Sequence, residues 1–201
     1  MPGDKKLETV EELLQLYRDP ARLAGYKYSQ PVVSTKGINN EKFHTNLPYE
    51  EIKKIVSSCG SALLSKVPLE DRAGLGWEHV GSTSIEGMPG AMMPDALLLL
   101  PSFPSSAVVL QALLDSGYYF SCASPLDRRD VWWFLVFTEG LLENGKLCLH
   151  VCTPDCPAAK ILLECRKEQW AFDDYKEAKV NAAKGSWMEY KRDKGANSKL
   201  L

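Results

Sequence analysis

The chain has 201 residues, enough for one domain with a substantial core but too few for two comparable domains. Apolar residues make up 45% of the sequence, which is close to the globular average and argues against a disordered chain. The 24 basic and 26 acidic residues nearly balance, giving a formal net charge of −2. This balance argues against a chain-wide electrostatic grip on nucleic acid, so we expect no nucleic-acid partner.

The N-terminus and the longest apolar run indicate in which cellular compartment the protein is expected. The N-terminal residues include lysines but no apolar segment followed by small residues, so no secretory signal is visible. The run at residues 96–100 is far too short to span a bilayer and suits a buried strand. We therefore expect a cytoplasmic protein without a membrane partner. Reduced, metal-free thiols are then expected for Cys59, Cys122, Cys148, Cys152, Cys156 and Cys165.

The N-terminal segment is predicted to hold a short helix and an irregular arm. Thr9 and Glu12 fit a capping box, and Pro20 helps to end the helix near Arg18. Residues 21–46 mix Gly, Pro, Ser, Thr and Asn with few periodic apolar positions, which is typical of a long connection.

A second helix is predicted to begin near Pro48, because apolar side chains recur at helical spacing over residues 52–64. We therefore divide the chain into an N-terminal helix and irregular arm, residues 1–45, and a main domain with C-terminal helices, residues 46–201.

The middle of the chain is predicted to form a sheet. Strands are expected, in chain order, over residues 77–80, 95–100, 118–122, 131–137 and 146–151. A helix capped by Ser105 or Ser106 and stopped by Gly117 lies between the second and third strands. The Asn-Gly turn at 144–145 predicts that the last two strands form a hairpin. The pattern becomes helical and charged from Ala158 onward. This order predicts an α/β (α+β) domain with a mixed β-sheet flanked by helices.

The most informative stretch reads EHVGSTSIEGMPGAMMPDALLLL. A strand runs into Gly81, where a ligand could approach the backbone closely, followed by the hydroxyl residues Ser82, Thr83 and Ser84. The hydroxyls and amides of such a turn can cradle a phosphate. Asp95 then opens a very apolar strand, where a lone carboxylate is unfavourable unless it binds something such as a metal-bound triphosphate. The alternative is a self-capped turn with a structural aspartate.

This stretch resembles the signature of the GrpB family, which reads approximately EHIGSTSVPGLAAKPIIDILV. The resemblance includes Glu78, the turn at 81–84, Gly87 and Asp95, and a second segment around His150 resembles the family's HLHV strand. It covers most of the main domain. The resemblance implies a nucleotidyltransferase-like fold, related to the palm of polymerase beta. It also implies Mg²⁺ and a nucleoside triphosphate as cofactors.

Further positions resemble the family more weakly. Arg166 stands where the family has the last arginine of its FRDYLR helix. Tyr175 with Lys179, and Tyr190 with Lys194, resemble the tyrosine–lysine pairs of its last helices. The resemblance thus implies that Arg166 and Lys179 help to bind the cofactor, and solvated helix faces are the equal alternative for the lysines.

Several positions depart from the family's pattern. Ala91 replaces the lysine before the aspartate, Cys148 replaces the first histidine of HLHV, and residues 161–163 replace the start of the FRDYLR helix. An active nucleotidyltransferase usually carries a second carboxylate where this chain has Leu97, and His150 is expected in the place of a third. A two-metal clamp needs several anionic oxygens around ions about 3.5–4 Å apart, so these residues cannot build it in the usual way.

The candidate catalytic residues are Asp95, His150 and Glu78. Asp95 is expected to hold a divalent ion or a polar substrate group and to face the same cleft as His150. We also expect the turn at 81–84 and Asp95 to lie in one pocket, at the ends of adjacent strands. Glu78 is equally suited to a catalytic base and to a buried partner of a basic residue. Cys148, His150 and Cys152 alternate on one strand face and hint at zinc, but same-face neighbours lie nearly 7 Å apart, so one ion hardly reaches all three.

Three functions stay open. The first is a magnesium-dependent transfer of a nucleotidyl group onto a small molecule or protein, and the second is a module that binds a nucleotide or phosphorylated small molecule without chemistry. The third is a family member with different chemistry, such as ligation or hydrolysis, at Asp95 and His150. We expect phosphate-bearing ligands to bind, with ordinary nucleotidyl transfer weak or absent because of Leu97. The oligomeric state is left open.

Overall fold

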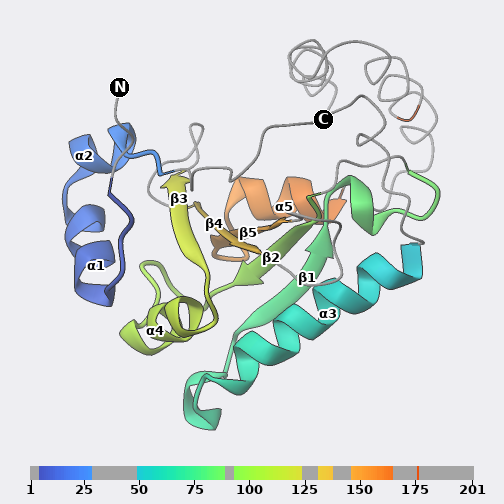
Figure 1. Cartoon of the computed structure of the whole chain (residues 1–201), viewed down its shortest axis with the longest axis horizontal. Coiled ribbons are helices and arrows are strands. Elements are labelled where there is room, and N and C mark those ends of the chain that lie inside the picture. Colours follow the sequence, from blue (N-terminus) through green and yellow to red (C-terminus); the bar gives the residue numbers. More distant parts are fainter. Residues whose placement is uncertain are drawn as a thin grey trace.

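The structure is a computed structural model that describes residues 5–28, 49–88, 93–123, 131–137, 146–164 and 176. Its helices are α1 (Val10–Arg18), α2 (Pro20–Gly25), α3 (Tyr49–Ser65), α4 (Ala107–Asp115) and α5 (Pro157–Glu164), with short 3₁₀ turns η2 (Leu69–Asp71) and η3 (Ser82–Ser84). Its strands are β1 (Gly76–Val80), β2 (Asp95–Leu99), β3 (Tyr119–Ala123), β4 (Trp132–Phe137) and β5 (Lys146–Cys152). Figure 1 shows how these elements are arranged.

The five strands form one mixed sheet in the order β1-β2-β5-β4-β3. Strand β2 pairs in parallel with β5, and the other three pairings are antiparallel. The predicted pairing of β4 with β5 is therefore confirmed, and the Asn-Gly turn at 144–145 lies outside the described residues. In the antiparallel pairing of β1 with β2, Val80 lies opposite Asp95, so β1 ends where β2 begins. The mixed sheet flanked by helices confirms the predicted α+β class.

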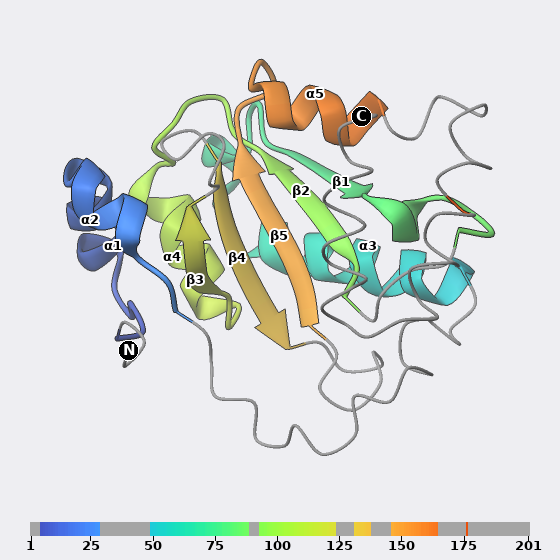
Figure 2. The same cartoon turned by 90° about the horizontal axis from the view of Figure 1, so that it is seen from above.

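The two faces of the sheet are covered differently. Helices α3 and α4 pack on one face, together with α1 and α2 near the β3 edge, and enclose the larger core cluster. On the opposite face α5 packs over a smaller apolar cluster that includes Leu97 and Cys152 (Figure 2). Within the described ranges, no helix has the length and apolarity needed to cross a membrane.

The N-terminal helices belong to the main core. The predicted capping box is confirmed, since the Thr9 side chain accepts from the Glu12 amide and the Glu12 carboxylate accepts from the Thr9 amide. The expectation of an irregular chain from residue 21 is wrong for its first residues, because α2 occupies Pro20–Gly25. Leu13 and Leu23 are buried in the larger cluster. The rest of the arm, from residue 29, lies outside the described residues.

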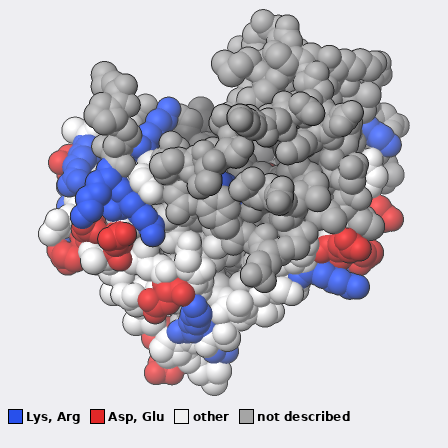
Figure 3. Space-filling view, in the orientation of Figure 1, with Lys and Arg blue, Asp and Glu red and all other residues white. Residues whose placement is uncertain are grey.

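Charges at this end of the molecule are mixed. Lys5 and Glu12 form an ion pair at 3.5 Å, and Arg18 and Glu11 form another at 3.8 Å. Figure 3 accordingly shows basic side chains beside acidic ones over the α1 and α2 end. Both ion pairs are exposed, so they contribute little to stability.

Gly60 is the point where α3 packs against β1. A Cβ atom at Gly60 would lie 2.5–2.6 Å from three atoms of the Trp77 indole ring, whose Nε1 donates to the Val56 carbonyl at 3.1 Å. We expect Gly60→Ala to lower the free energy of unfolding by about 1–3 kcal/mol, since the indole must move. The displaced indole therefore outweighs the roughly 1 kcal/mol of stability that alanine gains over glycine in a helix interior.

Denaturant unfolding measures this effect, with Gly25→Ala as the matched control. Gly25 also lies in a helix, but a Cβ atom there would meet nothing within 4 Å. We expect the control to leave stability within about 0.5 kcal/mol of the wild type. If Gly60→Ala were as stable as the wild type, the close packing of α3 on Trp77 would be wrong.

Candidate functional site

The candidate site lies on the α5 face of the sheet, at the edge where β1 ends and β2 and β5 begin. In the ladder Asp95 pairs with Cys148, and Leu97 pairs with Glu78 on one side and with His150 on the other. Paired residues and alternate residues of a strand share a face. All five side chains therefore belong to one face of the sheet.

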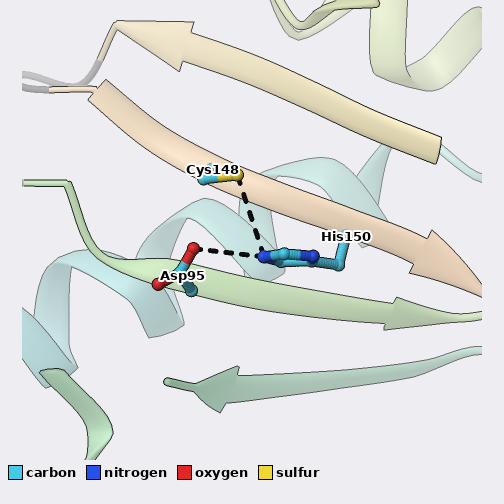
Figure 4. Close-up of side chains that lie close together, drawn as sticks. All are labelled: Asp95, Cys148 and His150. Carbon is cyan, nitrogen blue, oxygen red and sulfur yellow. Dashed lines mark hydrogen bonds and ion pairs between the residues drawn. The ribbon is translucent and has the colours of Figure 1, made fainter. Parts of the chain in front are cut away.

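Three of these side chains converge. Asp95 Oδ1 lies 3.1 Å from His150 Nε2, and Cys148 Sγ lies 3.8 Å from the same nitrogen. Figure 4 shows them pointing toward one another from β2 and β5. The side chains of Asp95 and His150 are 25% and 14% exposed, and Cys148 is buried. The structure thus brings Asp95 and His150 together from neighbouring strands, as expected from the sequence.

The shared nitrogen limits the chemistry of this trio. In a nucleophile–base–orienter triad, the histidine contacts the nucleophile through one ring nitrogen and the orienting carboxylate through the other. Here both Cys148 and Asp95 contact Nε2 of His150. The geometry therefore does not form a cysteine–histidine–aspartate relay. The Trp133 ring packs edge-on against the imidazole, with 5.8 Å between centroids, and helps to fix its orientation.

Gly81 accommodates the carboxylate of Asp95. Its backbone has φ 69° and ψ −170°, a conformation that L side chains rarely adopt. A Cβ atom on Gly81 would lie 2.7 Å from Asp95 Oδ2. The space that a side chain at residue 81 would need is therefore taken by the carboxylate of Asp95.

Two of the three hydroxyls in the turn stabilise the turn itself. The Ser84 hydroxyl donates to the Gly81 carbonyl at 2.7 Å, and Thr83 Oγ1 lies 3.0 Å from His79 Nε2. Both residues are buried. The self-capped alternative thus describes Thr83 and Ser84. Ser82 is half-buried, and its hydroxyl has no hydrogen-bond partner among the described residues, so it is the hydroxyl best placed to meet a ligand.

Leu97 and Glu78 do not add a carboxylate to the trio. Leu97 is fully buried and packs with Val80 and Cys152 under α5. Glu78 shares the face but lies on β1, with the strand that carries Leu97 between it and His150. Two strand spacings, about 10 Å, separate the backbone of Glu78 from that of His150. Glu78 therefore lies two strands from His150, and on the strand next to the one that carries Asp95.

Sequence reasoning missed Lys146, at the start of β5. It shares a face with Cys148 by strand alternation, and its Nζ lies 5.9 Å from the centroid of the Tyr119 ring. Burial lowers the pKa of Lys146 and raises the pKa of Tyr119 to about 12. The alternation along the predicted strand is the signal that could have placed this cation on the site face.

The remaining candidate residues lie away from this trio or outside the described residues. Cys152, considered with Cys148 and His150 as a zinc row, lies instead in the apolar cluster under α5. No disulfide joins the described cysteines, which are at positions 59, 122, 148, 152 and 156. The predictions for Ala91, Arg166, Lys179, the other residues of the tyrosine–lysine pairs and Cys165 lie outside the described residues.

Comparison with known proteins identifies a family. No curated protein matches the chain. The family described as GrpB protein matches residues 40–199, which is most of the chain. This match and the observed mixed sheet agree with the resemblance noted around the 81–84 turn. The chain belongs to the GrpB family.

Proposed function

We propose that the edge formed by the 81–84 turn and Asp95 binds a phosphate-bearing small molecule such as a nucleotide, and that this protein carries out little or no two-magnesium nucleotidyl transfer. The observation that carries both halves is the adjacency of Gly81 and Asp95 at one sheet edge, with a fully buried Leu97 where a second carboxylate would stand.

The binding half is supported by the polar groups at this edge. The Ser82 hydroxyl is half-buried, and the amides of Ser82 and Thr83 donate to no acceptor within the part of the chain that the structure describes. Successive amides and a hydroxyl in a turn suit the oxygens of a phosphate.

The catalytic half is supported by a mismatch with magnesium. Mg²⁺ prefers oxygen ligands in octahedral geometry, and a two-metal clamp needs several of them. Beside Asp95 this face offers an imidazole, a thiol and an apolar side chain. These residues do not fit two magnesium ions, so we derive no transfer step through them. A nucleoside triphosphate with Mg²⁺ nevertheless remains a ligand to be tested, because family membership motivates it.

Calorimetric titration tests the binding half. Nucleoside triphosphates, with and without Mg²⁺, and coenzyme A are titrated into the wild type, Ser82→Ala and Asp95→Ala. We expect at least one of these to bind the wild type, and Ser82→Ala to weaken that binding by about tenfold, corresponding to about 1.4 kcal/mol. Ser58→Ala, at an exposed serine of α3, is the matched control and should bind like the wild type.

The results separate the roles of the two residues. Absence of binding by every ligand would contradict the phosphate-binding proposal. Binding that survives Asp95→Ala but weakens in Ser82→Ala assigns the ligand to the turn and leaves another role for the aspartate. Robust magnesium-dependent nucleotidyl transfer by the wild type, lost in Asp95→Ala, would contradict the catalytic half.

A further inference from the structure

Asp95, Cys148 and His150 present three different kinds of donor atom to one point. The carboxylate oxygen, the thiol sulfur and the imidazole nitrogen all lie within 4.8 Å of one another. They come from two adjacent parallel strands, so the sheet fixes their spacing. This convergence has no role in the phosphate-binding proposal, which uses the turn and one side of the Asp95 carboxylate.

Two of the three donor–donor distances match the edges of a tetrahedral zinc site. Ligand bond lengths of about 2.0–2.2 Å for nitrogen and oxygen and about 2.3 Å for sulfur give O···N and N···S edges of about 3.4 and 3.6 Å. The observed values are 3.1 Å for Asp95 Oδ1 to His150 Nε2 and 3.8 Å for Cys148 Sγ to the same nitrogen. Both values lie within a few tenths of an ångström of the tetrahedral edges, and the third edge, between the Asp95 oxygen and the Cys148 sulfur, is no longer than 4.8 Å.

One ring nitrogen is close to both other groups. His150 Nε2 lies 3.1 Å from Asp95 Oδ1 and 3.8 Å from Cys148 Sγ, so the lone pair of that nitrogen, the carboxylate and the sulfur face one region. A divalent cation between them would engage all three groups. An ionised carboxylate and a thiolate would also balance its two positive charges, which suits the buried position of Cys148.

We propose that Asp95, Cys148 and His150 bind one divalent transition-metal ion, of which Zn²⁺ is the representative. Thiolate and imidazole ligands select such ions over Mg²⁺ and Ca²⁺. Three protein ligands leave the fourth tetrahedral position open, the arrangement in which zinc takes up a water or substrate group. Asp95 Oδ2 faces Gly81, so the ion and the 81–84 turn share one carboxylate.

The test uses the full-length chain, stripped with a chelator and titrated with Zn²⁺ against a chromophoric competitor, without any phosphate compound. We expect one ion per chain in the wild type. Cys148→Ser, His150→Ala and Asp95→Asn should each weaken binding by at least about 100-fold, since even indirect partners of a metal site change affinity by 10–100-fold. Cys59→Ser, at a thiol on α3, should bind like the wild type.

Cobalt substitution gives a second readout that does not depend on affinity. Co²⁺ bound to the wild type should show thiolate-to-metal charge-transfer absorption. Cys148→His should keep the ion through a nitrogen ligand but lose that absorption. Circular dichroism of each metal-free variant identifies any that fail to fold.

These metal titrations test the metal-binding proposal independently of the phosphate-binding proposal. Wild-type affinity for Zn²⁺ in folded Cys148→Ser and His150→Ala, or the absence of Zn²⁺ binding by the wild type, would overturn it. Equal affinity of the wild type for Mg²⁺ and Zn²⁺ would do the same. Because phosphate compounds are absent here and the calorimetry can be repeated with a chelator, either proposal can fail while the other stands.

Discussion

Gly81→Ala is expected to lower the free energy of unfolding by about 2–6 kcal/mol and to abolish ligand binding at the sheet edge. The backbone at Gly81, with φ 69° and ψ −170°, falls in a region that is essentially restricted to glycine and that costs other residues about 1–3 kcal/mol. The added Cβ would also lie 2.7 Å from Asp95 Oδ2. That contact displaces the carboxylate or the turn, and overpacking of this kind costs about 1–3 kcal/mol more.

Gly87→Ala separates the cost of backbone strain from the cost of the contact with Asp95. Gly87 also has a positive φ, 75°, but a Cβ atom there would meet nothing within 4 Å. We expect this control to cost only the backbone strain and to leave Zn²⁺ and phosphate binding close to wild type. Denaturant unfolding and the two titrations measure both variants. If the two alanine variants lost equal stability and bound ligands equally well, the close approach of Asp95 to Gly81 would be wrong.

A double-mutant cycle with Asp95→Ala isolates the contact itself. The shortened side chain removes Oδ2, so Gly81→Ala should be less destabilising in that background, with a coupling energy of about 1 kcal/mol or more. The Cβ of residue 95 remains, and it lies 3.2 Å from the position that a Cβ on Gly81 would take, so some cost should persist. Additivity within about 0.5 kcal/mol would show that the two residues do not interact.

The fold is largely predictable because its elements carry local signals. The capping box at Thr9, the apolar runs of the strands and the Ser106 cap of α4 all appear at their predicted places. Helix α2 escapes prediction for a local reason. Pro20 has the sequence context of a helix stop, but it is the first residue of α2, and the Asp19 side chain that precedes it accepts from the Arg22 amide.

The site is predictable only where its residues adjoin a recognisable turn. The resemblance and the strand alternation bring Asp95 and His150 into one hypothesis. The expected position of the 81–84 turn and Asp95 at the ends of adjacent strands is confirmed, but the closeness of Gly81 to the carboxylate depends on the register that sets Val80 opposite Asp95. A shift of one residue would turn Asp95 to the other face of the sheet.

The convergence of Cys148 depends on a pairing between strands that are distant in the sequence. Its position opposite Asp95 follows from the parallel register of β2 and β5, which no turn fixes. Sequence reasoning therefore groups Cys148 with Cys152, its neighbour on the same strand face, rather than with Asp95 on the next strand. The thiol at Cys148 also departs from the family's pattern, so the resemblance offers no guide to it.

Leu97→Asp restores the second carboxylate of the usual transferase pattern, and we expect it to come close to unfolding the protein. Leu97 is fully buried in an apolar cluster with Val80, Val131 and Cys152. An ionised carboxylate there has no partner among these residues, and an uncompensated buried charge costs several kcal/mol. Together with the lost packing, we expect a loss of about 5 kcal/mol or more at about pH 7, comparable to the whole stability of a small domain.

The pH dependence of this variant tests the cause. Desolvation favours the neutral carboxyl in the folded chain, so the folded state retains a proton that the unfolded state releases. Stability then falls as pH rises, and the destabilisation should shrink by about 1.4 kcal/mol for each unit that the pH is lowered from about 7 to about 5. Leu97→Asn, which loses the same packing without a charge, should show no such recovery. Chemical unfolding at several pH values measures both variants relative to the wild type.

We also expect no magnesium-dependent nucleotidyl transfer from Leu97→Asp under the conditions where it folds. An added carboxylate would still face a thiol and an imidazole beside Asp95, and these ligands suit a transition metal better than a second Mg²⁺. A stable Leu97→Asp variant whose unfolding is independent of pH would show that position 97 is hydrated. A gain of transfer activity in that variant would instead show that the site lacks only one oxygen ligand of a two-metal transferase.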